Sequence, residues 1–206
     1  MPNQLGGLYV IIDPAVAGER DVLHIAREAI AGGARLVQWR DKTREKGLQL
    51  PGVEALVGIC RQAGVPLIVN DDVDLALVAG VDGVHVGQKD LPVAAVRRIV
   101  PREWIVGAST NNVEEARVAE ADGADYVSVG NLFGTQSKDD TRPATLETLR
   151  AVKAAVRVPV CAIGGISEAT IADVIAAGAD MASVISAVVA SDDPRAAARR
   201  LSDAFS

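Results

Sequence analysis

The chain has 206 residues, of which 49% are hydrophobic and only 3% aromatic, and its formal net charge is −6. The negative charge argues against a general affinity for nucleic acid or anionic membrane, although a local cluster of Lys and Arg can still bind an anionic ligand. The N-terminus lacks a signal-peptide pattern, and no apolar run reaches the roughly 18 residues of a membrane helix. Cys60 and Cys161 have no CxxC spacing. We therefore expect a cytoplasmic protein with reduced thiols.

One local pattern occurs four times along the chain. An Ala-rich helical run ends at Gly and is followed by a short Val-rich strand, at Ala31–Val37, Ala79–Val86, Ala121–Val129 and Ala177–Val184. Glycine is the residue that most often ends a helix in the left-handed conformation. Each copy therefore predicts a helix that leads directly into a strand.

The other predicted elements lie between these copies. Short, mostly apolar runs predict four further strands at Leu8–Asp13, Pro66–Asn70, Trp104–Ala108 and Pro159–Ile163. Helical periodicity is found at Val22–Ala31, Gly47–Ala63, Val73–Val78, Val93–Ile99, Val113–Ala121, Leu146–Ala155, Glu168–Ala176 and Pro194–Ala204. The predicted chain thus alternates eight strands with eight helices.

This strict alternation calls for a parallel sheet with right-handed crossovers. Such a sheet can stay open, as in a doubly wound fold, or it can close at eight strands. We favour closure because the repeats remain similar to the end of the chain and because polar residues gather at the strand ends. No linker divides the sequence, so we predict one closed parallel (β/α)8 TIM barrel that covers residues 1–206 as a single domain.

The working groups of such a barrel belong at the C-terminal ends of its strands. The second strand ends with Gln38, Arg40 and Lys42, which alternate with Trp39 and Asp41 and so point to one side. A cluster of two cations and an amide is one interpretation, and a solvated strand end without function is the other. Further polar side chains follow the third, fifth and sixth strands: Asn70, Ser109 and Lys138.

Two carboxylates, Asp71 and Asp90, follow the neighbouring third and fourth strands. Mg²⁺ typically takes one or two protein carboxylates and fills its remaining positions with water and substrate phosphate. The alternative is that such residues only cap the next helix, a role open to Asp72, Asp74 and Asp90. Because Asp71 and Asp90 close neighbouring strands, their carboxylates could share one hard cation such as Mg²⁺.

The seventh and eighth strands end with Gly164-Gly165 and Ile185-Ser186. Loops after these two strands form the usual phosphate site of the fold, and glycine lets backbone amides approach an anion closely. The two histidines form no proton-transfer pair, since His24 is expected to be solvated and His85 to be a hydrogen-bonded structural residue. The sequence contains neither a Ser-His-Asp arrangement nor a GxGxxG motif, which disfavours nucleophilic and dinucleotide chemistry.

Taken together, these motifs resemble the thiamine-phosphate synthase family. The similarity runs from residue 8 to about residue 204 in the family's order, through Val37–Lys42, Val69–Ala76, Gly83–Pro92, Gly107–Thr110, Thr135–Lys138, Ala162–Ile166 and Val184–Ser186. Gly-Gly-Ile occurs in many phosphate-binding barrels, but the combination is specific. Members of the family join a pyrimidine diphosphate to the nitrogen of hydroxyethylthiazole phosphate and release pyrophosphate.

The resemblance implies a role for each part of the strand ends. The pyrimidine diphosphate would be held by Gln38, Arg40, Lys42, Asn70, Ser109 and Lys138, and the catalytic groups would be Arg40, Lys42, Ser109 and Lys138. Asp71 and Asp90 would carry Mg²⁺. The thiazole phosphate would be held by Thr135, Gln136, Ser137, Gly165, Ile185 and Ser186. The implied partners are small phosphorylated substrates, and a homodimer is expected by analogy with the family.

Three residues depart from the commonest family pattern, with Asp72 where Arg is frequent and Asn131 and Gly134 where Pro is frequent. They bear on substrate affinity rather than on the reaction. Two rival functions remain. A thiazole tautomerase relative would not need a metal pair with a diphosphate cluster, and a non-catalytic ligand sensor would tend to lose these charged groups. The polar loop 134–143 is expected to close over bound ligands.

Overall fold

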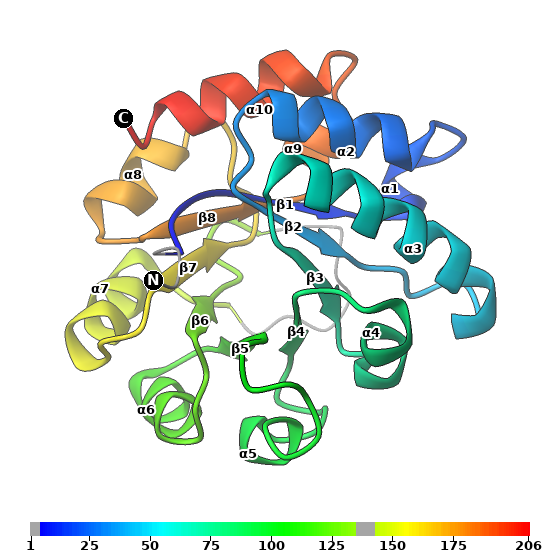
Figure 1. Cartoon of the computed structure of the whole chain (residues 1–206). Coiled ribbons are helices and arrows are strands. Elements are labelled where there is room, and N and C mark those ends of the chain that lie inside the picture. The colour runs from blue at the N-terminus through cyan, green and yellow to red at the C-terminus, as the bar shows by residue number, and fades with distance from the viewer. Residues whose placement is uncertain (1–4, 135–142) are drawn as a thin grey trace.

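The computed structural model describes residues 5–134 and 143–206. Eight parallel strands pair in sequence order and β1 also pairs with β8, so the sheet closes into a barrel (Figure 1). The strands are β1 (Gly7–Ile12), β2 (Leu36–Trp39), β3 (Leu67–Asn70), β4 (Gly83–Val86), β5 (Ile105–Thr110), β6 (Tyr126–Val129), β7 (Val160–Ile163) and β8 (Met181–Val184). The predicted (β/α)8 barrel is confirmed.

Helices surround the barrel on all sides (Figure 1). They are α2 (Val22–Ala31), α3 (Lys46–Ala63), α4 (Val73–Ala79), α5 (Val93–Val96), α6 (Val113–Ala121), α7 (Leu146–Ala155), α8 (Ile171–Ala176) and α10 (Pro194–Asp203). Two short helices, α1 (Pro14–Ala17) and α9 (Ser186–Val189), were not predicted. The helix expected at residues 93–99 ends at Val96, and the one expected at 168–176 begins at Ile171.

The short helix α1 has clear local causes. Asp13 precedes it, and a carboxylate oxygen of Asp13 accepts a hydrogen bond from the amide of Ala15 at 3.0 Å. Pro14 occupies the first helical position, where its missing N–H is no loss. Asp13 therefore follows the last residue of β1 and caps the start of α1 at the rim of the barrel.

Two hydrophobic cores hold the layers together. Alternate strand residues such as Leu8, Val10 and Ile12 belong to the large core between the barrel and its helices. The opposite set forms a smaller buried cluster inside the barrel: Tyr9, Leu36, Ile68, Tyr126, Cys161 and Met181. The interior is thus a packed floor and not a channel, which leaves the strand ends as the place for ligands.

Three copies of the repeat contain Gly-x-Asp, and their Asp residues have a structural role at the opposite end of the barrel. The carboxylates of Asp82, Asp125 and Asp180 each accept a hydrogen bond from the first backbone amides of the preceding strand, at 2.9, 2.7 and 2.7 Å. Each aspartate thereby ties the start of one strand to the start of its neighbour. These three aspartates therefore act at the starts of the strands and not at the C-terminal rim.

Two further expectations concern the whole chain. Cys60 and Cys161 are both buried and free, as the sequence predicts for reduced thiols. Among the described helices, none has the length and apolar character needed to cross a membrane.

Candidate functional site

Alternation along β2 divides its C-terminal end into two sides, as predicted. Trp39 and Asp41 face the helical layer, where the Trp39 indole donates to Gln49 at 2.9 Å and Asp41 accepts from the amide of Thr43 at 2.9 Å. Arg40 and Lys42 face the other way, towards the rim. Two cations therefore stand on the same strand end, separated from the residues that only shape the following turn.

Arg40 is held by a partner that sequence reasoning did not find. Its guanidinium forms an ion pair with Asp13 at the end of the neighbouring strand β1. Asp13 is 2% exposed, and its other carboxylate oxygen is fixed by the amide of Ala15. A buried, hydrogen-bonded carboxylate fixes a guanidinium firmly, so Arg40 has a defined direction before any ligand arrives. The position of Asp13 at a strand end was the available signal.

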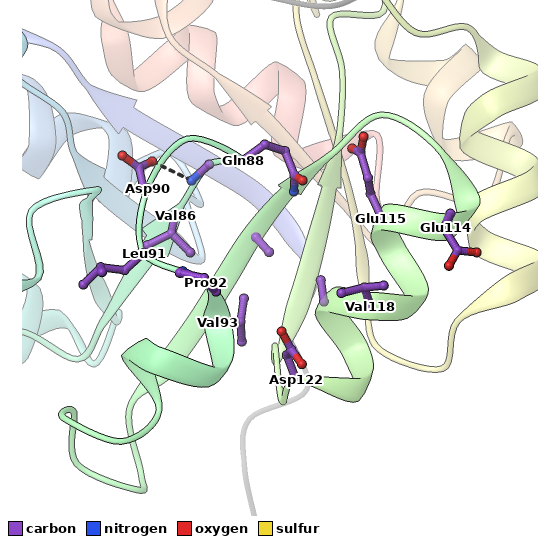
Figure 2. A pocket seen from close by; sticks show the side chains of 13 residues that line it. Val86, Gln88, Asp90, Leu91, Pro92, Val93, Glu114, Glu115, Val118 and Asp122 are labelled. Carbon is purple, nitrogen blue, oxygen red and sulfur yellow. Dashed lines mark hydrogen bonds between the residues drawn. The ribbon is translucent and has the colours of Figure 1, made fainter.

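The two predicted metal ligands lie against each other on adjacent strands. Asp71 has a positive φ of 61° and donates its backbone N–H to the carbonyl of His85 at 2.8 Å. Asp90 accepts from the amide of Gly87 at 2.8 Å, which turns its carboxylate back towards the end of β4 (Figure 2). A left-handed conformation is uncommon outside glycine, so the chain is locally strained to present Asp71 at this point.

The helix-cap alternative does not hold for these carboxylates. The residue at the cap of α4 is Asp72, and it makes no side-chain cap hydrogen bond. The cap position of α5 is Pro92, not Asp90. Neither Asp71 nor Asp90 is thus the cap residue of the helix that follows it.

The surroundings of Asp71 favour a cation. Burial raises the pKa of Asp71, and the adjacent carboxyl of Asp90 raises it further, while the ion pair with Lys42 opposes the change. Two carboxylates in contact repel each other unless a proton or a cation lies between them. No group of three or more metal-binding side chains exists in residues 5–134 and 143–206. The pair fits Mg²⁺, which needs few protein carboxylates and completes its shell with water and phosphate.

The unusual Asp72 does not add an unbalanced charge to this site. Lys46, at the start of α3, approaches carboxylate oxygens of both Asp72 and Asp74 at 2.9 Å. The extra negative charge of Asp72 is therefore neutralised by its ion pair with Lys46.

The predicted side chains on the barrel floor are also brought together. Gln38 and Asn70 are buried, and Ser109 is partly buried. The Nε2 atom of Gln38 donates to the Tyr9 hydroxyl at 2.5 Å, and Ser109 lies 2.9 Å from Nε2 of His85. The prediction that His85 is hydrogen-bonded inside the strand is confirmed, and His24 is exposed as expected.

A different construction is found at the ends of β7 and β8. Gly164 and Gly165 have φ angles of 102° and 67°, and a Cβ atom at Gly165 would lie 2.4 Å from the carbonyl oxygen of Gly134. A side chain at Gly165 is thus excluded by the loop after β6. Ile185 is the cap residue of α9 and Ser186 is its first, exposed residue.

The loop after β6 joins this glycine pair through its backbone. The amides of Leu132 and Phe133 donate to the carbonyls of Ile163 and Gly164 at 3.1 and 3.0 Å, and the peptide between Gly130 and Asn131 is cis. The carbonyl of Asn131 accepts from Ala144 at 3.0 Å. The predicted ligands Thr135, Gln136, Ser137 and Lys138, and most of the loop 134–143, lie outside the described residues.

A separate pocket of about 290 Å³ lies between α5 and α6, behind the loop that carries Asp90 (Figure 2). Its inner wall is apolar, with Leu91, Val93 and Val118, and its edge carries Glu114 and Asp122. Because the segment from Gly87 to Pro92 forms one wall, the shape of this pocket and the position of Asp90 depend on the same few residues.

The model of the family described as thiamine monophosphate synthase matches residues 8–188. The chain belongs to this family. A thiamine-phosphate synthase from Roseiflexus castenholzii is 49% identical over 98% of the chain and 89% of that protein, and one from Methanoculleus marisnigri is 49% identical over 95% and 93%. The solved thiamine phosphate pyrophosphorylase from Pyrococcus furiosus superposes with a TM-score of 0.88 at 36% identity, covering 97% of this chain and 95% of that one.

More distant barrels share only the fold with this thiamine monophosphate synthase family member. A 3-hexulose-6-phosphate synthase structure superposes with a TM-score of 0.69 at 22% identity, over 97% of this chain and all of that one. The resemblance inferred from short motifs is therefore confirmed at the level of the family over nearly the whole chain.

Proposed function

We propose that the protein is a thiamine-phosphate synthase, a transferase that joins 4-amino-2-methyl-5-(diphosphooxymethyl)pyrimidine to hydroxyethylthiazole phosphate. The bond between the methylene carbon and the diphosphate oxygen breaks, and its electron pair leaves with pyrophosphate. The thiazole nitrogen supplies the pair for the new C–N bond, which gives thiamine phosphate. The observation that carries this proposal is the cluster of Arg40, Lys42, Asp71 and Asp90 on the adjoining strands β2, β3 and β4 in a member of this family.

The charged half of the rim fits the leaving group. A departing pyrophosphate accumulates negative charge, and fixed cations that meet this charge lower the barrier. Arg40 enters the site already oriented by Asp13, and Lys42 stands beside Asp71. Lys138 would join them from the loop after β6. When bound at Asp71 and Asp90, Mg²⁺ would add electrostatic stabilisation of the diphosphate oxygens.

The glycine half of the rim fits the thiazole phosphate. Gly165 is exposed and has a positive φ, and it follows β7, whose neighbour β8 leads into α9 at Ile185 and Ser186. Backbone N–H groups in such a place can bind a phosphate without a counter-charge. Thr135, Gln136 and Ser137 would complete the contact from the loop after β6.

The reaction needs no general base. The thiazole nitrogen attacks with its own lone pair, and the pyrimidine amino group feeds electrons towards the breaking bond. Holding the two rings in line can supply a large share of the rate, on the order of 7–11 kcal/mol in favourable cases. This agrees with His85, whose two ring nitrogens are both hydrogen-bonded within the barrel floor.

Three wider expectations belong to the same proposal. The chain would work as one barrel domain on small phosphorylated substrates in the cytoplasm, where the buried free thiols of Cys60 and Cys161 stay reduced. The expected homodimer can use the exposed apolar side chains of Leu77 and Val78 on α4 and of Ile99 after α5. Sedimentation velocity on the wild type and on a Val78→Glu variant would measure this association directly.

Incubation of the purified protein with both substrates and Mg²⁺ tests the function itself. We expect pyrophosphate and thiamine phosphate in equal amounts, with no product when either substrate is left out or when EDTA removes the metal. Conversion of the thiazole phosphate into a tautomer, with no release of pyrophosphate, would identify a tautomerase. Tight binding of either compound with no turnover would identify a sensor.

A further inference from the structure

A buried chain of hydrogen bonds crosses the floor of the barrel from β2 to β5. It links Gln38 to Tyr9 at 2.5 Å, Tyr9 to Tyr126 at 3.0 Å, Tyr126 to Nδ1 of His85 at 2.9 Å, and Nε2 of His85 to Ser109 at 2.9 Å. We call these five residues the floor relay. Its two end residues are assigned to the pyrimidine diphosphate, whereas its three middle residues have no role in the mechanism described above.

Tight packing fixes the positions of the relay residues. A Cβ atom at Gly107 would lie 2.1 Å from Cζ of Tyr126, so only glycine at this position leaves room for the tyrosine ring. The His85 ring stacks on Tyr126 with centroids 5.5 Å apart, and the Tyr9 ring meets Tyr126 edge-on at 6.0 Å. The relay can therefore vary in the direction of its hydrogens but hardly in the placement of its atoms.

The placement of the Gln38 amide, with Nε2 towards Tyr9, sets the direction of the hydrogen bonds in the relay. Burial raises the pKa of Tyr9 and of Tyr126, so both phenols keep their hydrogens. The Tyr9 oxygen accepts from Gln38, which leaves its own hydrogen for Tyr126. Tyr126 in turn donates to Nδ1 of His85.

The direction determines the tautomer of His85 and the state of Ser109. With Nδ1 accepting, a neutral imidazole carries its hydrogen on Nε2 and donates it to the Ser109 oxygen. The hydroxyl hydrogen of Ser109 is then left for a ligand. The reverse direction would require the Gln38 amide to be turned so that Oε1 accepts from the Tyr9 hydroxyl, with Nε2 then facing the ligand.

We propose that the floor relay makes Ser109 a donor and Gln38 an acceptor towards the pyrimidine ring, with Tyr9, Tyr126 and His85 as positioning residues that set ring specificity. At the other end of the relay, Oε1 of Gln38 is buried and has no partner within the described part of the chain. The inference rests on the proposed function, because that substrate offers an amino donor beside a ring-nitrogen acceptor. A 4-oxo ring presents the opposite pattern and would leave both protein groups unpaired.

The tautomer of His85 tests the direction of the relay without any substrate. The chain contains two histidines, and the exposed His24 can be assigned with a His24→Gln variant in ¹⁵N NMR spectra of labelled protein. At pH 8 we expect His85 to be neutral with its hydrogen on Nε2. In Tyr126→Phe the donor to Nδ1 is lost, so the hydrogen should shift towards Nδ1. A wild-type His85 protonated on Nδ1 would overturn the proposal.

Equilibrium binding tests the effect on specificity without requiring turnover. The dissociation constants of the 4-amino pyrimidine diphosphate and its 4-oxo analogue are measured by calorimetry, with Mg²⁺ and without the thiazole substrate. Removing one hydroxyl in Tyr126→Phe should weaken binding of the amino compound roughly threefold to tenfold and narrow its preference over the oxo compound. Affinity for hydroxyethylthiazole phosphate should not change.

Two substitutions of His85 form a matched pair. The amide nitrogen of Gln can replace Nε2 as a donor to Ser109, so His85→Gln should keep most of the ring preference. Asn reaches only to the position of Nδ1, so His85→Asn should lose the preference as Tyr126→Phe does. Thermal unfolding of each variant controls for folding. Equal preferences in Tyr126→Phe and wild type, or a parallel loss for both substrates, would overturn the proposal. Absence of wild-type pyrophosphate release, by contrast, would count against the proposed function alone.

Discussion

The two halves of the rim differ in the groups that they would offer to the anions of the proposed reaction. On β2 to β4 the groups are charged side chains, each held by a partner, as Arg40 is by Asp13 and Lys42 by Asp71. On β7 and β8 the groups are backbone amides near Gly165 and the start of α9, and a side chain at Gly165 is excluded by the carbonyl of Gly134. The charged half should therefore respond to single changes of charge, and the backbone half to single added atoms.

The largest effect is expected from Asp71→Asn. This change removes the negative charge but keeps the shape, and Asn tolerates the left-handed backbone found at Asp71, with φ of 61°. Loss of a metal carboxylate should lower turnover on the order of 100-fold or more and raise the Mg²⁺ requirement. Alanine is a poorer choice here because it would add backbone strain. Pyrophosphate release measured across a Mg²⁺ titration gives both quantities.

Asp72→Asn is the matched control for this change. It removes a negative charge from the same loop, but the Asp72 carboxylate pairs with Lys46 whereas that of Asp71 pairs with Lys42. Turnover and Mg²⁺ dependence should stay within about twofold of the wild type. Equal losses in the two variants would mean that the loop, and not the Asp71 carboxylate, is what the reaction needs.

Arg40→Lys should give the next largest effect. Lys keeps the charge but cannot reproduce the planar contact of a guanidinium with Asp13 and a diphosphate at the same time. We expect roughly a tenfold loss of kcat/KM for the pyrimidine diphosphate, with little change in the KM of the thiazole phosphate. Arg44→Lys serves as the control, because Arg44 pairs with Asp41 on the other side of the same strand end. A larger effect on the thiazole phosphate would reverse the assignment of the two halves.

The backbone half should respond to Gly165→Ala. Alanine at position 165 would have to adopt a positive φ of 67°. Its methyl carbon would also lie 2.4 Å from the carbonyl oxygen of Gly134, which would have to move. Gly64→Ala is a matched control, since Gly64 ends α3 with φ of 66° and nothing lies within 4 Å of the added atom. Each variant should lose about 1 kcal/mol of unfolding free energy from the backbone conformation. Only Gly165→Ala should lose further unfolding free energy, because of the close carbonyl, and only this variant should raise the KM for the thiazole phosphate.

The smallest effect concerns pH in the metal-free protein. Burial raises the pKa of Asp71 above its unfolded value, so its contribution to stability is fully present below that unfolded value, about 3.9, and is lost as pH rises through the folded pKa. Asp71→Asn lacks this loss. In EDTA the variant should therefore gain stability relative to the wild type between acid and neutral pH. If the difference in unfolding free energy between Asp71→Asn and the wild type is the same at every pH, the Asp71 carboxylate does not destabilise the metal-free protein.

The fold could be predicted because its causes are local and repeated. Helix, glycine and short apolar strand recur along the chain, and strict alternation leaves few topologies. The short helices α1 and α9 were missed because four residues give no periodicity. Likewise, the predicted end of α5 was wrong by one turn, since Ile99 continues the three-residue spacing of Val93 and Val96 although the helix ends at Val96.

The site could be predicted only as far as strand ends reveal it. Alternation gives the direction of Arg40 and Lys42, but it does not reveal that Asp13 is the partner of Arg40, 27 residues away. The contact between Tyr9 and Tyr126 joins residues 117 apart and depends on the absent side chain of Gly107. Such pairings are set by the closure of the barrel, which places distant strands face to face, and no local pattern in the sequence encodes them.

A crystal structure with Mn²⁺, pyrophosphate and thiamine phosphate would test the division of the rim most directly. Mn²⁺ is a Mg²⁺ substitute whose anomalous scattering locates it without ambiguity. The account predicts a metal peak between Asp71 and Asp90, pyrophosphate on Arg40 and Lys42, and the single phosphate of thiamine phosphate at the amides near Gly165 and Ser186. A metal bound elsewhere, or the two anions in exchanged positions, would contradict it.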